Sequence, residues 1–83
     1  MDYELTQHAS DIITEREIQS RWIDLTLENP ELVEEDSEDE ELEHRFSRIE
    51  EYGNRVLRVV FNKRVNPIRI VTVYFDRTMK GRL

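Results

Sequence analysis

The sequence has no cysteine, and it has glycine only at positions 53 and 81. Without cysteine there is no disulfide framework, no thiolate nucleophile and no thiolate metal ligand, so the fold must rest on packing or on an oligomer interface. Two isolated glycines exclude the glycine-rich loops that hold nucleotide phosphates. The lack of disulfides fits a reducing compartment, and we expect a cytoplasmic protein that carries no cofactor.

Long apolar runs are missing as well. No run approaches the roughly 18 residues of a membrane span, and the N-terminus is acidic and polar where a secretory signal needs a basic start and an apolar core. His8 and His44 lack the neighbours of a zinc motif, no serine lies in a nucleophile elbow, and the acidic run lacks the glycine and spacing of an EF-hand. We therefore expect no membrane span, no metal site and no serine hydrolase activity.

What the chain does have is a strong division of charge. Residues 1 to 43 contain sixteen acidic and two basic side chains, a formal charge of −14, whereas residues 44 to 83 contain three acidic and ten basic ones, a charge of +7. The two halves together give the net charge of −7. A basic half can still meet phosphate groups if the acidic half faces elsewhere or moves, so the net charge does not exclude polyanion binding.

Two helices are predicted in the N-terminal half. Thr6 is suited to cap a helix over residues 6 to 15, in which apolar side chains recur on one helical stripe. A second helix over residues 18 to 28 ends before Pro30, because the residue before a proline is pushed out of the α region. Thr14 also begins a capping box, so an earlier division between the helices, or one bent helix, stays open.

Three segments rich in β-branched and aromatic residues follow, over residues 42 to 52, 55 to 62 and 67 to 76, and they predict an antiparallel meander. Residues 34 to 43 are too acidic to bury themselves and are expected to form a solvated loop, with a short strand at Leu32 and Val33 before it. The predicted fold is α+β, one domain over residues 1–83, with two N-terminal helices packed on one face of a three- to four-stranded antiparallel sheet.

Alternation along the predicted strands sorts their side chains onto two faces. The face expected under the helices carries apolar side chains: Phe46, Leu57, Val59, Phe61, Val71, Val73 and Phe75. The opposite face is expected to mix arginine, hydroxyl and β-branched side chains: Arg45, Ser47, Ile49, Val56, Arg58, Val60, Ile70, Thr72 and Tyr74. A face of this composition suits a ligand groove or a subunit contact, because a fully solvated face would be more polar.

The mixed face supplies the candidate catalytic residues Arg45, Arg58 and Tyr74, with His8 joining them from the first helix. Cleavage of RNA by its own 2′-hydroxyl asks for positioning, for cations that stabilise the charge developing on phosphorus, and for a group that moves protons. The competing interpretation is structural: the arginines form salt bridges with the acidic half, Tyr74 covers a surface, and His8 bonds to a backbone group. Trp22 is expected in the core or an interface, with base stacking as its alternative.

A set of short motifs runs through nearly the whole chain. In order they are Tyr3, Leu5, Thr6, His8 and Ala9, then Glu15-Arg16 and Ile18, Asn29-Pro30, Arg45, Val56-Leu57-Arg58-Val59-Val60, and Ile70-Val71-Thr72-Val73-Tyr74. Together they resemble a small bacterial family of unknown function that is itself similar to the RelE/ParE superfamily, including the BrnT-type toxins. The resemblance implies a compact α+β domain of the RelE/BrnT type and a toxin-like ribonuclease, or a descendant that has lost catalysis.

Carried over residue by residue, the polar positions that match the family pattern are His8, Arg16, Arg45, Arg58 and Thr72, and Tyr74 matches its terminal aromatic position. The family itself assigns them no role; the candidate catalytic residues are His8, Arg45, Arg58 and Tyr74, and the candidate binding residues are Arg16 and Thr72. The chain departs from the superfamily in one respect, because those toxins are usually basic whereas this chain carries −7 and an acidic segment at 34–43. An acidic loop repels RNA within about a Debye length of roughly 8 to 10 Å.

Two functions follow as hypotheses. In the first, the protein binds or cleaves RNA as part of a toxin–antitoxin pair, restrained by an antitoxin-like partner or by its own acidic segment, which would then mimic a polyanion on the basic strands. In the second, it is a noncatalytic protein interaction module or a homodimer without enzymatic activity.

Overall fold

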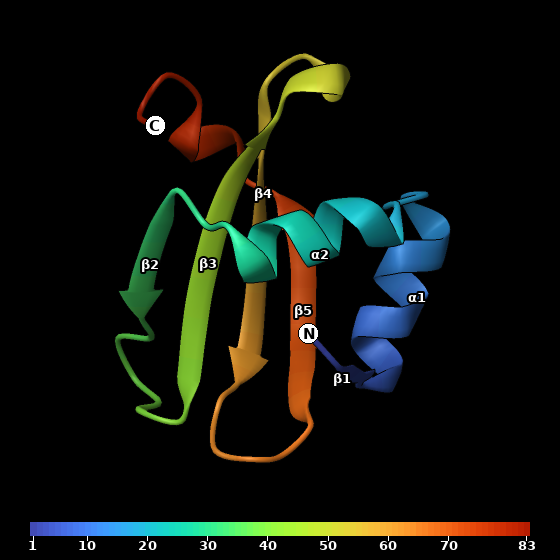
Figure 1. Cartoon of the computed structure of the whole chain (residues 1–83), viewed down its shortest axis with the longest axis vertical. Coiled ribbons are helices and arrows are strands. Elements are labelled where there is room, and N and C mark those ends of the chain that lie inside the picture. Colours follow the sequence, from blue (N-terminus) through green and yellow to red (C-terminus); the bar gives the residue numbers. More distant parts are fainter.

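The computed structural model describes residues 1–83, and its centre is a five-stranded sheet with two helices on one face (Figure 1). The elements in chain order are β1 (Tyr3–Leu5), α1 (Gln7–Glu15), α2 (Ser20–Glu28), β2 (Leu32–Glu35), β3 (Leu42–Ile49), the short 3₁₀ helix η1 (Glu50–Tyr52), β4 (Arg55–Asn62), β5 (Ile68–Phe75) and a second 3₁₀ helix, η2 (Arg77–Met79). The α+β class predicted from the sequence is confirmed.

The sheet has the strand order β1-β5-β4-β3-β2. Strands β2 to β5 form an antiparallel meander, but β1 runs parallel to β5, with Tyr3 opposite Ile68 and Leu5 opposite Ile70. The sheet is therefore mixed and has five strands, where three or four antiparallel strands were predicted. The missed strand is only three residues long, and such a segment is too short to reveal the alternation that identifies a strand.

Both helices lie close to their predicted positions. Thr6 caps α1, and its hydroxyl accepts a hydrogen bond from the backbone N–H of Ala9 at 3.1 Å, as predicted. The second helix starts at Ser20, two residues later than predicted, with Gln19 at the N-cap position. The alternative capping box that begins at Thr14 does not form, because Glu17 adopts a left-handed conformation with φ of 52° and ends the first helix.

The strand boundaries were predicted best for β4, whose observed range is the expected 55 to 62. The segment expected as strand 42 to 52 stops at Ile49, where η1 begins. The acidic segment is only in part a loop, because Glu34 and Glu35 belong to β2 and pair with His44 and Glu43 of β3. The turn itself covers residues 36 to 41.

The helix-covered face of the sheet holds the larger apolar core. It contains Ala9, Ile18, Trp22, Ile23, Leu27, Ile49, Leu57, Val59, Phe61, Ile70 and Val73. The alternation predicted for β4 is confirmed by Leu57, Val59 and Phe61. Trp22 is 6% exposed and belongs to this core, as expected.

The faces predicted for β3 are wrong, because of the register with β4. Residues opposite each other in an antiparallel pair share a face, and Phe46 lies opposite Arg58 while Ser47 lies opposite Leu57. Phe46 therefore lies with Arg58 on the face of the sheet opposite the helices, which we call the far face. Arg45 accordingly takes the helix-covered face, along with Ser47 and Ile49, which were expected on the far one.

The predicted assignment of β5 side chains to the two faces is wrong at one point, because the strand contains a bulge. Val60 of β4 pairs with Thr72, but the next residue, Phe61, pairs with Ile70, so Val71 has no partner. An unpaired extra residue reverses the alternation on its two sides. Ile70 consequently joins the helix-side core, where Val71 had been expected.

A second, smaller apolar cluster covers part of the far face. Phe46, Val56 and Met79 are buried there, with Leu32 and Leu83 packed against them. Met79 comes from η2, so the C-terminal segment folds back over the sheet opposite the helices. The far face thus carries both a small buried apolar cluster and the side chain of Arg58.

Candidate functional site

Arg58 is the centre of a polar network on the far face. Its Nε donates to His44 Nδ1 at 2.9 Å, and its Nη1 donates to Asp76 Oδ2 at 2.6 Å. The guanidinium also lies over the Phe46 ring, at 4.7 Å from its centroid, and over the Tyr74 ring at 5.8 Å. Arg58 and Tyr74 are therefore together, as predicted, but the arginine is already bound to the protein on two sides.

His44 uses both ring nitrogens within this network. Its Nδ1 accepts from Arg58, and its Nε2 lies 2.6 Å from Asp36 Oδ1, so the neutral ring carries its proton on Nε2. The hydrogen bond from His44, together with those from the backbone amides of Glu38 and Asp39, holds the pKa of Asp36 below its ordinary value. With both nitrogens engaged, His44 has no free lone pair with which to accept a proton from a substrate.

Asp76 connects Arg58 to the C-terminal turn through hydrogen bonds. Burial raises the pKa of Asp76, but hydrogen bonds from Thr78 and Arg58 outweigh this effect, and the pKa lies below its ordinary value. Its Oδ1 accepts from the Thr78 backbone N–H at 2.9 Å, which caps η2, and its own N–H donates to the Val56 carbonyl at 2.9 Å. Arg58 thereby fixes the turn that carries Arg77.

Arg45 does not share this site, which corrects the predicted groove. On the helix-covered face it donates from Nε to Glu43 Oε2 at 2.7 Å, and from Nη1 to the carbonyl oxygen of Leu27 in the last turn of α2. Its guanidinium lies 5.0 Å from the centroid of the Phe61 ring. The structure thus places Arg45 where it stabilises a helix end, on the other side of the sheet from Arg58.

His8 and Thr72 meet, but apart from the Arg58 network. The exposed His8 ring places Nε2 at 3.4 Å from the Thr72 hydroxyl, a long contact between α1 and β5. The predicted set of His8, Arg45, Arg58 and Tyr74 is therefore divided among separate places, and only the last two lie together.

Tyr74 and Arg16 come together in a groove that we call the tyrosine groove. Its volume is about 450 Å³, and its lining includes Arg16, Tyr52, Arg55, Tyr74, Phe75 and Arg77. The two tyrosines are 43% and 39% exposed, and the Arg55 guanidinium lies 5.0 Å from the centroid of the Tyr52 ring. The groove therefore combines accessible aromatic rings with arginines and contains one carboxylate, that of Glu15.

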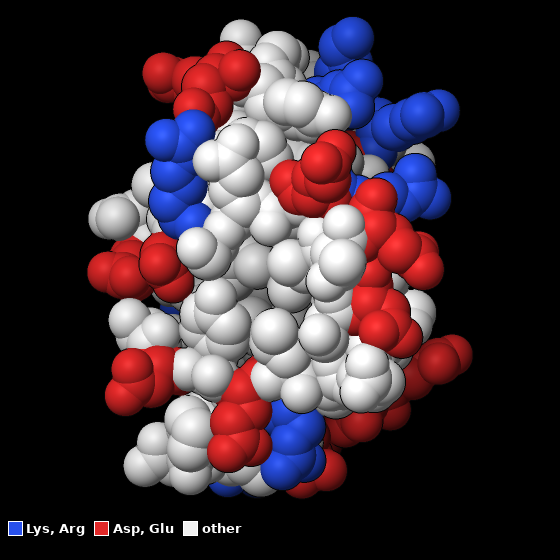
Figure 2. Space-filling view, turned by 90° about the vertical axis from the view of Figure 1, so that its right-hand side faces the viewer, with Lys and Arg blue, Asp and Glu red and all other residues white.

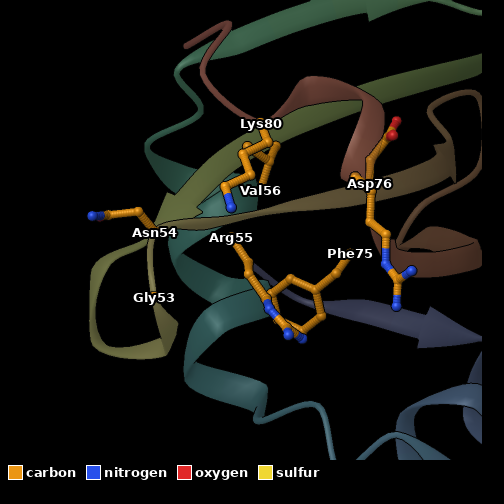
Figure 3. Close-up of a pocket in the computed structure, with 8 residues that line it drawn as sticks. Gly53, Asn54, Arg55, Val56, Phe75, Asp76 and Lys80 are labelled. Carbon is orange, nitrogen blue, oxygen red and sulfur yellow. The ribbon is translucent and has the colours of Figure 1, made fainter.

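A second hollow, the cationic pocket, adjoins the tyrosine groove. It has a volume of about 260 Å³ and is lined by Gly53, Asn54, Arg55, Val56, Phe75, Asp76, Arg77 and Lys80 (Figure 3). In the close-up the Lys80 side chain extends from the C-terminal turn towards Arg55 on β4, and the Asp76 carboxylate is turned away from Arg55 and Phe75. Arg55, Phe75 and Arg77 line both hollows.

The cations around these hollows have no acidic partner. Salt bridges engage Arg21, Arg45, Arg48, Arg58 and Lys63. Four of the unpaired cations line the two hollows, and we call them the cationic end: Arg16, Arg55, Arg77 and Lys80. Basic side chains gather near the top of the face drawn in Figure 2, at its upper right.

Sequence reasoning missed three of these four residues. Arg16 was expected as a binding residue, but Arg55, Arg77 and Lys80 were not singled out. The excess of basic residues after position 43 was the available signal. It could not show which of those bases would be neutralised by carboxylates and which would remain unpaired.

The acidic turn lies far from the cationic end. The β2–β3 connection, residues 36 to 41, is at the bottom of Figure 1, whereas the connection from η1 to β4 and the C-terminal turn are at the top. Apart from hydrogen bonds with the adjacent Leu42, the acidic turn contacts His44 through Asp36 and the backbone of Lys63 through Glu41. The acidic turn therefore does not cover the cationic end, although Glu35 and Glu43 of the acidic segment do pair with Lys63 and Arg45 of the basic half.

No group of three or more His, Cys, Asp or Glu side chains is arranged to hold a metal ion. None of the helices has the length and apolar character that crossing a membrane would require.

The fold and the site define an α+β domain in which two helices cover one face of a five-stranded mixed sheet and unpaired cations gather at one end. By sequence the chain belongs to the family described as a domain of unknown function, DUF4258, which matches residues 5–75. We found no match among curated proteins or among solved structures. Nothing in these comparisons links the chain to the RelE/ParE superfamily or to BrnT. Arg77 and Lys80 lie beyond the end of the family match.

Proposed function

We propose that this protein binds single-stranded RNA at its cationic end, without cleaving it. One observation carries the proposal: four cations without acidic partners line two adjoining hollows, and one of these hollows also holds two exposed tyrosines. Proteins that bind single strands combine a positively charged groove, which follows the phosphates, with aromatic rings on which bases stack. Tyr52 and Tyr74 supply such rings, and Arg16 and Arg55 lie beside them.

The net charge of −7 is compatible with this proposal because the charge is segregated. The molecule is 32 Å long on its longest axis, and screening at physiological salt acts over about 8 Å. The acidic turn and the cationic end lie towards opposite ends of that axis. Nearer the groove, Glu51 is neutralised by a 2.5 Å salt bridge with Arg21, and it also accepts from the Trp22 indole. Glu15 lines the groove, where the three arginines outnumber it.

The proposal is binding rather than cleavage, because neither histidine lines the two hollows as a free proton acceptor beside the cations. His44 has both ring nitrogens occupied, and Arg58 is held by His44 and Asp76. His8 contacts Thr72 and is not among the residues that line the tyrosine groove. The RNA recovered after incubation with the protein is therefore expected to be intact on a denaturing gel.

Fluorescence anisotropy with a labelled, 5′-hydroxyl oligouridylate of twelve nucleotides tests the proposal. We expect the Arg55→Ala/Arg77→Ala double variant to bind about tenfold more weakly or worse, because it loses two charge-assisted contacts to phosphate. The matched control is Arg64→Ala/Arg69→Ala, which removes two exposed, unpaired arginines outside both hollows and should bind as the wild type does.

The salt dependence adds a quantitative expectation. A plot of the logarithm of the association constant against the logarithm of the salt concentration has a slope of about −0.7 for each phosphate of a single strand that is neutralised. Four cations that each neutralise one phosphate therefore predict a slope of about −3. The Arg55→Ala/Arg77→Ala variant should retain about half of that slope. Failure of the wild type to bind, or equal weakening by the two double variants, would contradict the proposal.

A further inference from the structure

The cationic pocket has a composition that the proposed single-strand binding does not by itself require. Arg55 lines it from the start of β4, and Lys80 lines it from the C-terminal turn (Figure 3). Arg77, at the start of η2, lines it as well. None of the three has an acidic partner, and two of them, Arg55 and Arg77, also border the tyrosine groove. Three cations thus surround one small hollow at the edge of a longer groove.

The size of the pocket limits what can occupy it. Its volume of about 260 Å³ falls below the range of about 300 to 1,000 Å³ that is usual for sites holding drug-sized ligands. A phosphate group with its ester oxygen and a few waters fits such a space, since a water occupies about 30 Å³. The pocket therefore has room for the phosphate end group of a ligand.

The charge of the pocket indicates which phosphate it prefers. An internal phosphodiester carries a single negative charge, whereas a phosphate monoester carries about −1.5 to −2 near neutral pH and offers three strong acceptor oxygens. The only carboxylate in the lining is that of Asp76, and hydrogen bonds to Arg58 and Thr78 engage it. Three free cations match a dianion better than a monoanion.

We propose that the cationic pocket binds the terminal phosphate monoester of an RNA strand whose neighbouring nucleotides lie in the tyrosine groove. This inference rests on the proposed function. Arg55, Phe75 and Arg77 form the boundary between the two hollows, so a strand that ends in the pocket passes directly to Tyr74 and Tyr52. The protein then recognises RNA ends that carry phosphate, as left by a ribonuclease or a kinase.

The test uses three oligouridylates of eight nucleotides, labelled internally. One has hydroxyls at both ends, one has a 5′-monophosphate, and one has a 3′-monophosphate. We expect one of the two phosphorylated RNAs to bind about tenfold more tightly than the hydroxyl-ended RNA, because the terminal group adds charge-assisted contacts. Comparison of the two phosphorylated RNAs then identifies the end that is recognised.

Two variants separate the pocket from the groove. Lys80 lines the pocket and not the groove, so Lys80→Ala should weaken binding of the phosphorylated RNA more than binding of the hydroxyl-ended RNA and so remove the preference between them. Arg16 lines the groove and not the pocket, so Arg16→Ala should weaken binding of all three RNAs by the same factor. Circular dichroism of both variants checks that they are folded.

The outcomes distinguish the terminal-phosphate site from the single-strand RNA binding on which it depends. Equal binding of all three RNAs by the wild type, or a phosphate preference that survives Lys80→Ala, would overturn the terminal-phosphate site and leave single-strand binding intact. Absence of binding to any of the RNAs would overturn both.

Discussion

Replacing Asp76 by asparagine should destabilise the protein in a way that depends on pH. The substitution keeps the shape of the side chain but removes the charge that pairs with Arg58 Nη1 at 2.6 Å. The Asp76 side chain is 6% exposed and that of Arg58 is 23% exposed, so water replaces the lost partner only in part. A hydrogen bond to a charged group contributes about 1.5 to 3 kcal/mol to stability.

We therefore expect Asp76→Asn to lower the free energy of unfolding by about 2 kcal/mol at pH 7. For a protein of this size, that corresponds to a fall in Tm of about 8 to 16 °C. Thermal unfolding followed by circular dichroism measures it. The control is Asp2→Asn at an exposed position, for which the change should stay within about 0.5 kcal/mol.

The pH dependence follows from the direction of the pKa shift. The pKa of Asp76 in the folded protein is lower than the ordinary value of 3.8, so the folded state favours the charged form. The stability that this provides is present above the ordinary pKa and is lost as the pH falls through the folded-state pKa. The difference in the free energy of unfolding between wild type and Asp76→Asn should have its full size at pH 5 to 7 and should become smaller below about pH 4. Equal stability at pH 7, or a difference that persists undiminished in acid, would refute this account of the Arg58 network.

Three further predictions follow from other parts of the molecule. Phe46→Ala opens the far-face cluster and should cost about 3 to 5 kcal/mol, measured by urea unfolding; a loss below about 1 kcal/mol would show that this cluster contributes little. Thr6→Ala removes the cap of α1 and should cost about 1 kcal/mol, seen as a fall in Tm of about 4 to 8 °C, whereas an unchanged Tm would contradict the capping role. Glu40→Gln/Glu41→Gln should change RNA affinity by less than about twofold at physiological salt, because this turn lies far from the cationic end; a large gain would restore the masking hypothesis.

The elements of the fold could be predicted because each carries a local signal. Thr6 marks the start of α1, Pro30 marks the end of α2, and the β-branched residues of β4 give both its limits and its alternation. The strand β1 could not be predicted in this way. Its three residues become a strand only because β5 offers a free edge, which is a property of the tertiary structure.

The faces of the sheet required information that the sequence does not carry locally. Whether Phe46 lies opposite Arg58 or opposite Leu57 depends on the register between β3 and β4, and a shift of one residue exchanges the two faces. The bulge at Val71 had a similar effect on Ile70. The predicted groove therefore lost Arg45, although Arg58 and Tyr74 remained together.

The candidate site was predicted least well, because it depends on which charges are neutralised. Arg45, Arg48 and Arg58 resemble Arg55 and Arg77 in the sequence, but the first three lie beside carboxylates in the fold and the last two do not. The expected antitoxin-like partner and self-association stay predictions, since the structure contains a single chain.

The central claim is that RNA contacts the cationic end, and an NMR titration tests it most directly. Amide signals of the ¹⁵N-labelled protein would be followed while an oligouridylate of eight nucleotides is added. The account predicts that the signals that move belong to the residues lining the two hollows, among them Arg16, Tyr52, Arg55 and Arg77, while those of residues 36 to 41 stay in place. Unchanged spectra, or shifts confined to the acidic turn or to the groove beside Trp22 and Leu25, would contradict it.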